Sequence, residues 1–240
     1  MLAVLQGIIL TMLYSRTPDS FIINLNDKED DFLFATERYD RKILDTSKEL
    51  MGKKVPLRLH QEDFAQALGI TASQKYEKNG KDYLADVFEL IKNYSSNPIE
   101  DQIRLWDLCI FNYLIGNTDN HVKNIALLYS EDLKGIRLAP AYDLLSTVIY
   151  DSSTEKMSLN IDGEYDIRNI NQKSFENEAK KLGLGKGIAT QHFLSIVEKF
   201  EMALEQSTYE LEEQGYGVVV DIQKQILKKA GIHNFKLTNP

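Results

Sequence analysis

The chain has 240 residues, of which 43% are hydrophobic and 27% are charged, and its formal net charge is −8. This length suffices for one large domain or two small lobes with a real hydrophobic core. The aromatic content of 10% excludes a disordered chain, and a single cysteine, Cys109, excludes a disulfide scaffold. Such an acidic chain gains no long-range attraction to nucleic acid, although a local basic patch remains compatible with the sequence.

The chain opens on an apolar stretch over residues 1–14. No basic residue precedes this stretch and no small-residue cleavage site follows it, so the stretch does not fit a signal peptide. It is also shorter than the ~20 residues that span a bilayer. We expect a buried helix here and no association with a membrane.

The next segments predict a strand pair and then a change of pattern. Residues 21–25 and 32–36 are short β-type runs on either side of an acidic turn, and they predict a hairpin. Residues 41–56 are charged and mixed, which indicates a loop. From Leu59 onward the pattern favours a helix that ends at Gly69.

Helical spacing dominates the rest of the chain. Residues 99–115 are apolar on nearly every face, which predicts a central buried helix that ends at Gly116. Residues 125–129 and 136–139 predict a second hairpin. The other predicted helices span residues 82–94, 174–182, 188–211 and 218–230. The fold class is therefore α+β, with a small strand-containing N-terminal part and a mainly helical body.

A dense polar loop follows the central helix. Residues 116–124 read Gly-Asn-Thr-Asp-Asn-His-Val-Lys-Asn, and Asp143 follows nineteen residues after Asn124. Polar groups held against a buried helix need partners or ligands. Asp119 and Asn124 lie five residues apart with a later Asp beyond a hairpin, which is the order that protein kinases use for the catalytic Asp and the two Mg²⁺ ligands.

Each of these residues also has a simpler interpretation. Asp119 could form a turn or cap, His121 could be a hydrogen-bonded structural histidine, Lys123 could be a solvated surface charge, and Asp143 could cap a following helix. A metal-dependent hydrolase with Asp119 and His121 as a ligand pair is a further alternative. The remaining histidines, none of which has ligand-type spacing near a carboxylate, are His60, His192 and His233.

Four segments in order resemble one known family. Residues 111–124 and 138–146 resemble the catalytic and metal-binding segments of HipA-like serine/threonine kinases, the toxin halves of bacterial toxin–antitoxin modules. Residues 37–41, Glu-Arg-Tyr-Asp-Arg, are similar to the hinge of that family. Residues 58–64 together with Lys75-Tyr76-Glu77 are similar to a segment that follows the hinge. The resemblance covers about 110 residues and implies a protein-kinase-like fold.

The resemblance implies roles for the polar loop. It implies that Asp119 is the catalytic base and that Asn124 and Asp143 hold Mg²⁺. His121 and Lys123 stand at positions that the family fills with the same residue types, and they are expected to support the loop and the transferred phosphate.

In the hinge, the resemblance implies that the backbone of Glu37 and Tyr39 holds the adenine of ATP and that Asp40 accepts hydrogen bonds from the ribose. It implies a partial N-lobe and hinge over residues 1–40 and a helical C-lobe over residues 41–240. The glycine-rich phosphate loop and the strand lysine of the family do not precede Glu37. The sequence therefore resembles the C-terminal two-thirds of such a kinase, with residues 1–14 similar to the later part of a bracing helix.

By resemblance, the expected function is transfer of the γ-phosphate of ATP, with Mg²⁺, to a Ser or Thr hydroxyl of a protein substrate, as a toxin in the cytoplasm. A small DNA-binding antitoxin is the expected partner, and no direct contact with nucleic acid is expected. The alternative is a truncated or degenerate kinase that binds a nucleotide or a partner without turnover.

Overall fold

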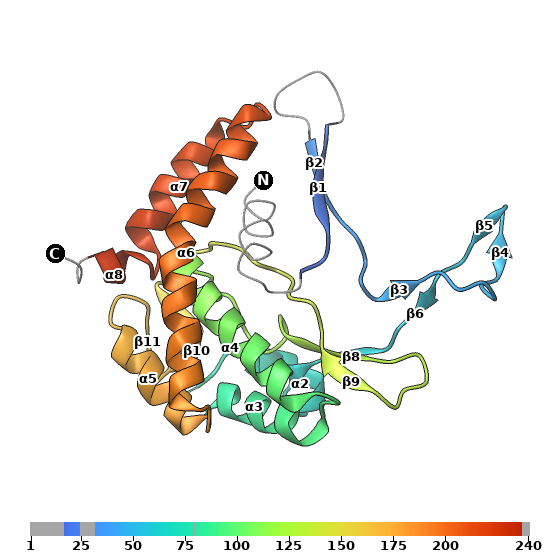
Figure 1. The fold of residues 1–240 in the computed structure, drawn as a ribbon, viewed down its shortest axis with the longest axis horizontal. Coiled ribbons are helices and arrows are strands. Elements are labelled where there is room, and N and C mark those ends of the chain that lie inside the picture. Colours follow the sequence, from blue (N-terminus) through green and yellow to red (C-terminus); the bar gives the residue numbers. More distant parts are fainter. Residues whose placement is uncertain (1–16, 25–31, 79, 237–240) are drawn as a thin grey trace.

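The computed structural model describes residues 17–24, 32–78 and 80–236, and the account below concerns these residues. The helix expected over residues 1–14 lies outside them. Helices and several small antiparallel sheets make up the described chain (Figure 1), which confirms the predicted α+β class. Within this part of the chain, no helix is both long and apolar enough to cross a membrane.

The predicted helices are present with small changes at their ends. They are α3 (Tyr83–Tyr94), α4 (Pro98–Ile115), α5 (Gln172–Lys181), α6 (Lys186–Glu213) and α7 (Val218–Lys229), with the single-turn helices α2 (Phe64–Ala67) and α8 (His233–Lys236) and a 3-10 turn over Ala72–Gln74. Together these helices form the body of the molecule (Figure 1).

Helix α4 is the centre of the core. It begins with Pro98 in its first turn, where the missing N–H of proline costs no hydrogen bond. Trp106 and Tyr113 both pack against Phe175 while Phe111 packs against Phe200, and all three residues of the helix are at least 99% buried. The helix packs against α3 on one side and α6 on the other. It is therefore a fixed support for the loop that follows it.

The second predicted hairpin is also present. Strands β8 (Ala126–Tyr129) and β9 (Ile136–Leu138) pair antiparallel, and β7 (Gln61–Asp63) adds to the free edge of β8. The helix predicted from Leu59 is wrong over β7. Asp63 accepts a hydrogen bond from the Gln66 backbone and caps α2, so the helix begins only at Phe64.

The sequence patterns missed one hairpin. Strands β10 (Lys156–Ile161) and β11 (Glu164–Asp166) form it within a region predicted to be helical. Residues 157–161 read Met-Ser-Leu-Asn-Ile, an alternation of apolar and polar residues that is itself a strand signal, and all five are buried. Asp162 and Gly163 make the turn with positive φ angles.

Three strand pairs lie before the body in the described part of the chain. The first predicted hairpin is confirmed as β1 (Ser20–Asn24) and β2 (Phe32–Thr36), which form an antiparallel ribbon. The loop predicted over residues 41–56 is wrong in part, because four two-residue strands pair here: β3 (Arg41–Lys42) with β6 (Leu57–Arg58), and β4 (Glu49–Leu50) with β5 (Lys53–Lys54). Figure 1 shows the ribbon and this arm extending away from the helices.

Candidate active site

The polar loop leaves α4 through Gly116. This residue has a φ of +70°, which favours glycine, and an added Cβ would lie 2.3 Å from the Val148 side chain. The Val148 N–H donates to the Gly116 carbonyl at 3.0 Å. The end of α4 and the segment around Val148 are therefore in direct contact, and only glycine fits between them.

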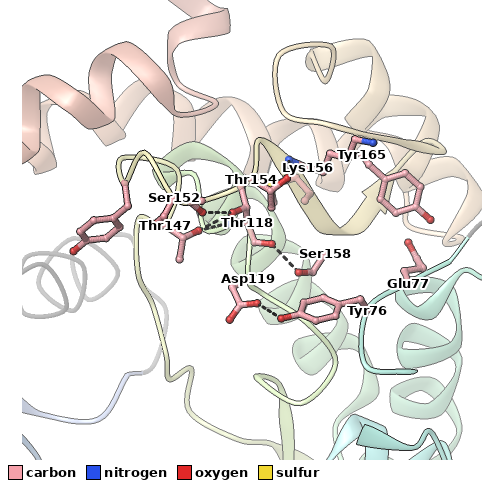
Figure 2. Close-up of a pocket in the computed structure, with 13 residues that line it drawn as sticks. Tyr76, Glu77, Thr118, Asp119, Thr147, Ser152, Thr154, Lys156, Ser158 and Tyr165 are labelled. Carbon is pink, nitrogen blue, oxygen red and sulfur yellow. Dashed lines mark hydrogen bonds between the residues drawn. The ribbon is translucent and has the colours of Figure 1, made fainter. Parts of the chain in front are cut away.

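Hydroxyl groups from residues 147–158 hold Thr118 in place (Figure 2). The Thr118 N–H donates to Thr147 Oγ1 at 2.7 Å, and Ser158 Oγ donates to the Thr118 carbonyl at 2.7 Å. The Thr118 hydroxyl also lies 2.8 Å from Thr147 Oγ1 and 3.4 Å from Ser153 Oγ. The residue before Asp119 thus has both its backbone groups and its side chain engaged.

Asp119 is half-buried, and its carboxylate faces Tyr76 (Figure 2). The Tyr76 hydroxyl donates to Asp119 Oδ1 at 2.8 Å. The Asp119 carbonyl accepts from the His121 N–H at 2.8 Å and from Asn124 Nδ2 at 3.1 Å. These two bonds close the loop on itself, and Asn124 Oδ1 makes no hydrogen bond to the described residues.

His121 is 5% exposed and lies at the centre of the loop. Lys75 Nζ is 2.7 Å from its Nε2 atom, while Nδ1 is buried with no partner among the residues described. Burial lowers the pKa of His121, the charge of Lys75 lowers it further, and the carboxylates of Asp119 and Asp143 oppose this shift. The geometric link between the two acidic segments is Asn117, which lies two residues before Asp119 and donates to the Asp143 carbonyl at 3.1 Å.

Asp143 has an uncommon backbone conformation, with a φ of +56°. Its carbonyl accepts from Asn117 Nδ2 at 3.1 Å, and the same amide nitrogen donates to Asn112 Oδ1 in α4 at 2.8 Å. No helix starts after Asp143, so the interpretation of this residue as a helix cap is wrong. Its carboxylate is exposed and makes no hydrogen bond or ion pair within the described chain.

Lys123 has a partner that its sequence position does not reveal. Its Nζ atom forms an ion pair with Asp63 Oδ2 at 2.9 Å, and its carbonyl accepts from the Tyr142 hydroxyl at 2.8 Å. The residue is therefore not the freely solvated charge of the simpler interpretation. These bonds join the loop to the start of α2 and to the residue before Asp143.

The hinge residues Glu37 and Asp40 have hydrogen-bond partners within the chain. The Glu37 N–H donates to the Asp19 carbonyl at 2.8 Å. The Asp40 carboxylate is buried and accepts from Arg38 Nε and Nη2 at 2.9 and 2.8 Å, with Arg41 on its other side. The hydrogen bond from Arg38 lowers the pKa of Asp40, and burial opposes it. The Asp40 carboxylate is thus paired with arginines, and a role toward ribose stays a prediction.

The ring of Tyr39 connects the hinge to the second acidic segment. It stacks on the Tyr142 ring, with 6.4 Å between their centroids. Because Tyr142 precedes Asp143 directly, this contact places the hinge beside the expected metal-binding segment. The adenine-binding role predicted for the backbone of Glu37 and Tyr39 remains a prediction.

Two pockets lie on different sides of these residues. The larger, of about 750 Å³, has Asp119 in its wall and is lined mainly by hydroxyl groups, among them those of Tyr76, Thr147 and Ser158 (Figure 2). The smaller, of about 310 Å³, lies between the β1–β2 ribbon and residues 141–145, which include Asp143. The site therefore offers one cavity beside each of the two acidic residues.

The donor set fits one kind of metal ion. Asn124 Oδ1 and the Asp143 carboxylate are hard oxygen donors, which Mg²⁺ prefers. No group of three or more His, Cys, Asp or Glu side chains arranged to hold a metal occurs in the described ranges. This observation does not favour the hydrolase alternative, whose ligand pair would need a third such residue.

Sequence reasoning missed several residues that shape the site. Lys75 and Tyr76 contact the loop from more than forty positions upstream, and Thr147 and Ser158 hold it from downstream. The only sequence signal for the first two is the family-like run Lys75-Tyr76-Glu77. A lone Thr or Ser in a polar segment carries no signal of such a contact.

The fold and the site define an α+β domain of protein-kinase type, with two acidic residues and an asparagine brought together at the end of a buried helix. The sequence model of the HipA-like C-terminal domain matches residues 10–207. The chain therefore belongs to the family of HipA-like proteins.

Individual relatives agree with this assignment. The Sinorhizobium fredii protein named "Putative kinase Y4mE" is 36% identical over 164 residues, which are 68% of this chain and 37% of that protein. The serine/threonine-protein kinase toxin HipA of Shewanella oneidensis is 28% identical over 181 residues, 71% of this chain and 40% of that protein. The chain thus spans about two-fifths of the length of these relatives.

A solved structure shows the same fold. It is the Shewanella oneidensis HipA in a complex with HipB and operator DNA, with a TM-score of 0.78 and 22% sequence identity. The match covers 95% of this chain and 54% of that one. At this identity the likeness concerns the fold, and it confirms the kinase-like architecture that the sequence motifs implied.

Proposed function

We propose that this chain carries the catalytic part of an ATP- and Mg²⁺-dependent protein kinase that phosphorylates Ser or Thr hydroxyls of a protein substrate. The observation that carries the proposal is one hydrogen-bonded loop that holds Asp119 and Asn124 and is bonded through Asn117 to the backbone of Asp143. Phosphoryl transfer needs positioning and charge stabilisation more than covalent chemistry, and this set supplies both. The relative that is named as a serine/threonine-protein kinase toxin supports the choice of acceptor.

In this proposal Asp119 orients the acceptor hydroxyl and accepts its proton. Its Oδ1 atom is engaged by Tyr76, which leaves Oδ2 for the acceptor in the larger pocket. Asn124 Oδ1 and the Asp143 carboxylate would hold Mg²⁺, which neutralises charge on the phosphates when bound. His121, whose pKa is lowered mainly by burial, fixes the loop through its contact with Lys75.

We assign ATP to the side of Asp143. The smaller pocket separates Asp143 from Phe34 and Thr36 on the ribbon, so a nucleotide there would have its phosphates next to the expected metal ligands. The backbone of Glu37 and Tyr39 lies where the ribbon meets the arm. The division into residues 1–40 and 41–240 is part of the same proposal.

The biological setting is proposed by analogy with the relatives. One is named as a toxin, and the solved HipA is in a complex with HipB and DNA. We propose that this chain acts as the toxin of a similar module, with a small DNA-binding protein as its partner. The net charge of −8 suggests that contact with DNA would come through that partner.

Thermal unfolding with and without Mg²⁺–ATP tests the nucleotide site. Ligand at 100 times its dissociation constant stabilises the folded state by about 2.7 kcal/mol, so the melting temperature should rise. Asp143→Ala should remove the rise that depends on Mg²⁺, whereas Asp86→Ala, an exposed carboxylate on α3, should keep it. No rise for the parent protein would contradict nucleotide binding.

Transfer itself is tested with labelled ATP and a cell lysate. The parent protein should label substrate proteins, and Asp119→Ala should reduce the rate by roughly a hundredfold or more, as expected for loss of a general base. The Asp86→Ala variant again serves as the control. Equal labelling by the parent and by Asp119→Ala would rule out this chain as the source of activity.

The hinge supports a second candidate, a module that binds a partner or nucleotide without turnover. Arg38 and Arg41 already engage the Asp40 carboxylate, and the Glu37 N–H is bonded to Asp19, so these hinge groups have structural partners within the chain. A thermal shift with Mg²⁺–ATP but no labelling of any protein would favour this candidate over the kinase.

A further inference from the structure

In the run Lys75-Tyr76-Glu77, the first two side chains contact the polar loop and the third contacts the body of the molecule. Lys75 Nζ lies 2.7 Å from His121 Nε2, and the Tyr76 hydroxyl donates to Asp119 Oδ1 at 2.8 Å. The Lys75 ammonium also lies 4.7 Å from the centroid of the Tyr76 ring, whose edge-to-face contact with the His121 ring has a centroid distance of 5.4 Å. Two neighbouring residues thus hold the two central residues of the loop.

The third residue anchors the run to the body. Glu77 is 9% exposed, and burial raises the pKa of its carboxyl. The carboxylate accepts from the Asn160 N–H at 2.8 Å, from Asn160 Nδ2 at 2.6 Å and from the Tyr83 N–H at 2.5 Å. These bonds join the run to β10 and to the first turn of α3, so Tyr76 extends from a fixed base.

The start of the run is fixed as well. The Tyr83 hydroxyl donates to the Gln74 carbonyl at 3.0 Å, just before Lys75. Helix α3 therefore holds both ends of the run, through the hydroxyl of Tyr83 and through its N–H. The Tyr76 side chain, which is 47% exposed, therefore has a fixed orientation.

We propose that Tyr76 is a positioning residue for Asp119, and that residues 75–77 form a clamp that fixes the catalytic loop from outside the loop. The hydroxyl of Tyr76 holds one carboxylate oxygen of Asp119, so the other oxygen faces the larger pocket in a single orientation. Lys75 fixes the neighbouring imidazole and prevents the loop from turning about Asp119. The assignment of a role in transfer rests on the proposed kinase function, whereas the clamp itself does not.

Hydrogen–deuterium exchange of residues 117–125 tests the clamp without any need for activity. Tyr76→Phe removes only the hydroxyl and keeps the ring contacts with His121 and Lys75. Loss of one hydrogen bond of this kind should speed exchange in the loop by roughly two- to tenfold. Tyr94→Phe, on an exposed tyrosine of α3, should leave exchange unchanged. Unchanged exchange in Tyr76→Phe would overturn the proposal.

Steady-state kinetics with labelled ATP separates positioning from a general structural role. In Tyr76→Phe, kcat should fall by roughly tenfold while KM for ATP stays the same, because only the orientation of Asp119 changes. A raised KM for ATP with unchanged kcat would overturn the positioning role. Faster exchange in Tyr76→Phe together with no transfer by the parent protein would support the clamp and contradict the proposed function instead.

Discussion

The loop after α4 and the ribbon with its arm differ in how they are held. The loop residues Asn117, Thr118 and His121 are each at least 94% buried and bond to α4, to residues 147–158 and to Lys75. In the ribbon, Phe21, Ile23 and Leu33 are 41–51% exposed, and the arm ends in the fully exposed Met51. The ribbon is held mainly by its own antiparallel backbone pairing.

This difference shows that the chain fixes the loop after α4 more firmly than it fixes the hinge. The expected base and metal ligands lie on a support with buried apolar contacts and many hydrogen-bonded backbone and side-chain groups, which oppose movement. The hinge lies on elements with few buried side chains, and such elements open at low free-energy cost. The predictions below test this contrast, beginning with the largest effect.

The largest effect is expected at Asp101, a fully buried carboxylate in α4. It accepts from Arg137 Nε at 2.9 Å, from Ser95 Oγ at 2.6 Å and from the Leu138 N–H at 2.9 Å. Asp101→Ala leaves these donors without an acceptor and should lower the free energy of unfolding by about 3–5 kcal/mol. Urea unfolding measures the loss, and a change below about 1 kcal/mol would contradict the view of α4 as the fixed support.

Gly116 allows a matched comparison between two glycines with the same backbone conformation. Gly116→Ala places a methyl group 2.3 Å from Val148, whereas Gly183→Ala, with a φ of +74°, meets nothing within 4 Å. Both variants place alanine in the left-handed region, so they share the cost of backbone strain. The difference between their losses of unfolding free energy therefore measures the steric clash with Val148. Gly116→Ala should be less stable than Gly183→Ala by about 1–3 kcal/mol in urea unfolding, and equal losses would show that the contact relaxes freely.

A pH dependence should follow from His121. Its pKa in the folded protein is lowered, mainly by burial, so the unfolded chain binds more protons below about pH 6.5. Stability should therefore fall as the pH drops from 6.5 toward the folded pKa, by at most about 1.4 kcal/mol for each pH unit. Urea unfolding at pH 7.5 and 5.5 should show a smaller drop for His121→Gln, and identical drops would exclude His121 as the cause.

The smallest effect is expected in the ribbon. Leu33 is 51% exposed, so Leu33→Ala should change the free energy of unfolding by about 0.5 kcal/mol or less. Leu105→Ala in α4, where the side chain is fully buried, should cost about 2–5 kcal/mol. Comparable losses for the two variants would break the contrast between the ribbon and the body.

The sequence predicts most of the helical body because its signals are local. Helix α4 follows from its run of apolar residues and from Gly116, and the β8–β9 hairpin from two short apolar runs around a turn. Strand β10 also has a local signal, the alternation Met-Ser-Leu-Asn-Ile, which the prediction of a helical region overlooked. What periodicity could not predict is that Ser158 and Asn160 are buried, because their partners Thr118 and Glu77 are distant in the sequence.

The candidate site likewise contains residues that the sequence could predict and residues that it could not. Asp119, Asn124 and Asp143 could be selected from their types and spacing, and their roles remain predictions. The structure links the loop of the first two to the backbone of the third through Asn117. The partners that fix them could not be selected. Tyr76 and Asp63 look like ordinary surface residues until the fold places them against Asp119 and Lys123.

The backbone of Asp143 sets two properties of this position against each other. A non-glycine residue in the left-handed region costs up to about 1–2 kcal/mol, and glycine would relieve this cost. Asp143→Gly would therefore relax the backbone and remove the carboxylate in a single change. The stability of the fold and the proposed binding of Mg²⁺ thus place different demands on this one residue.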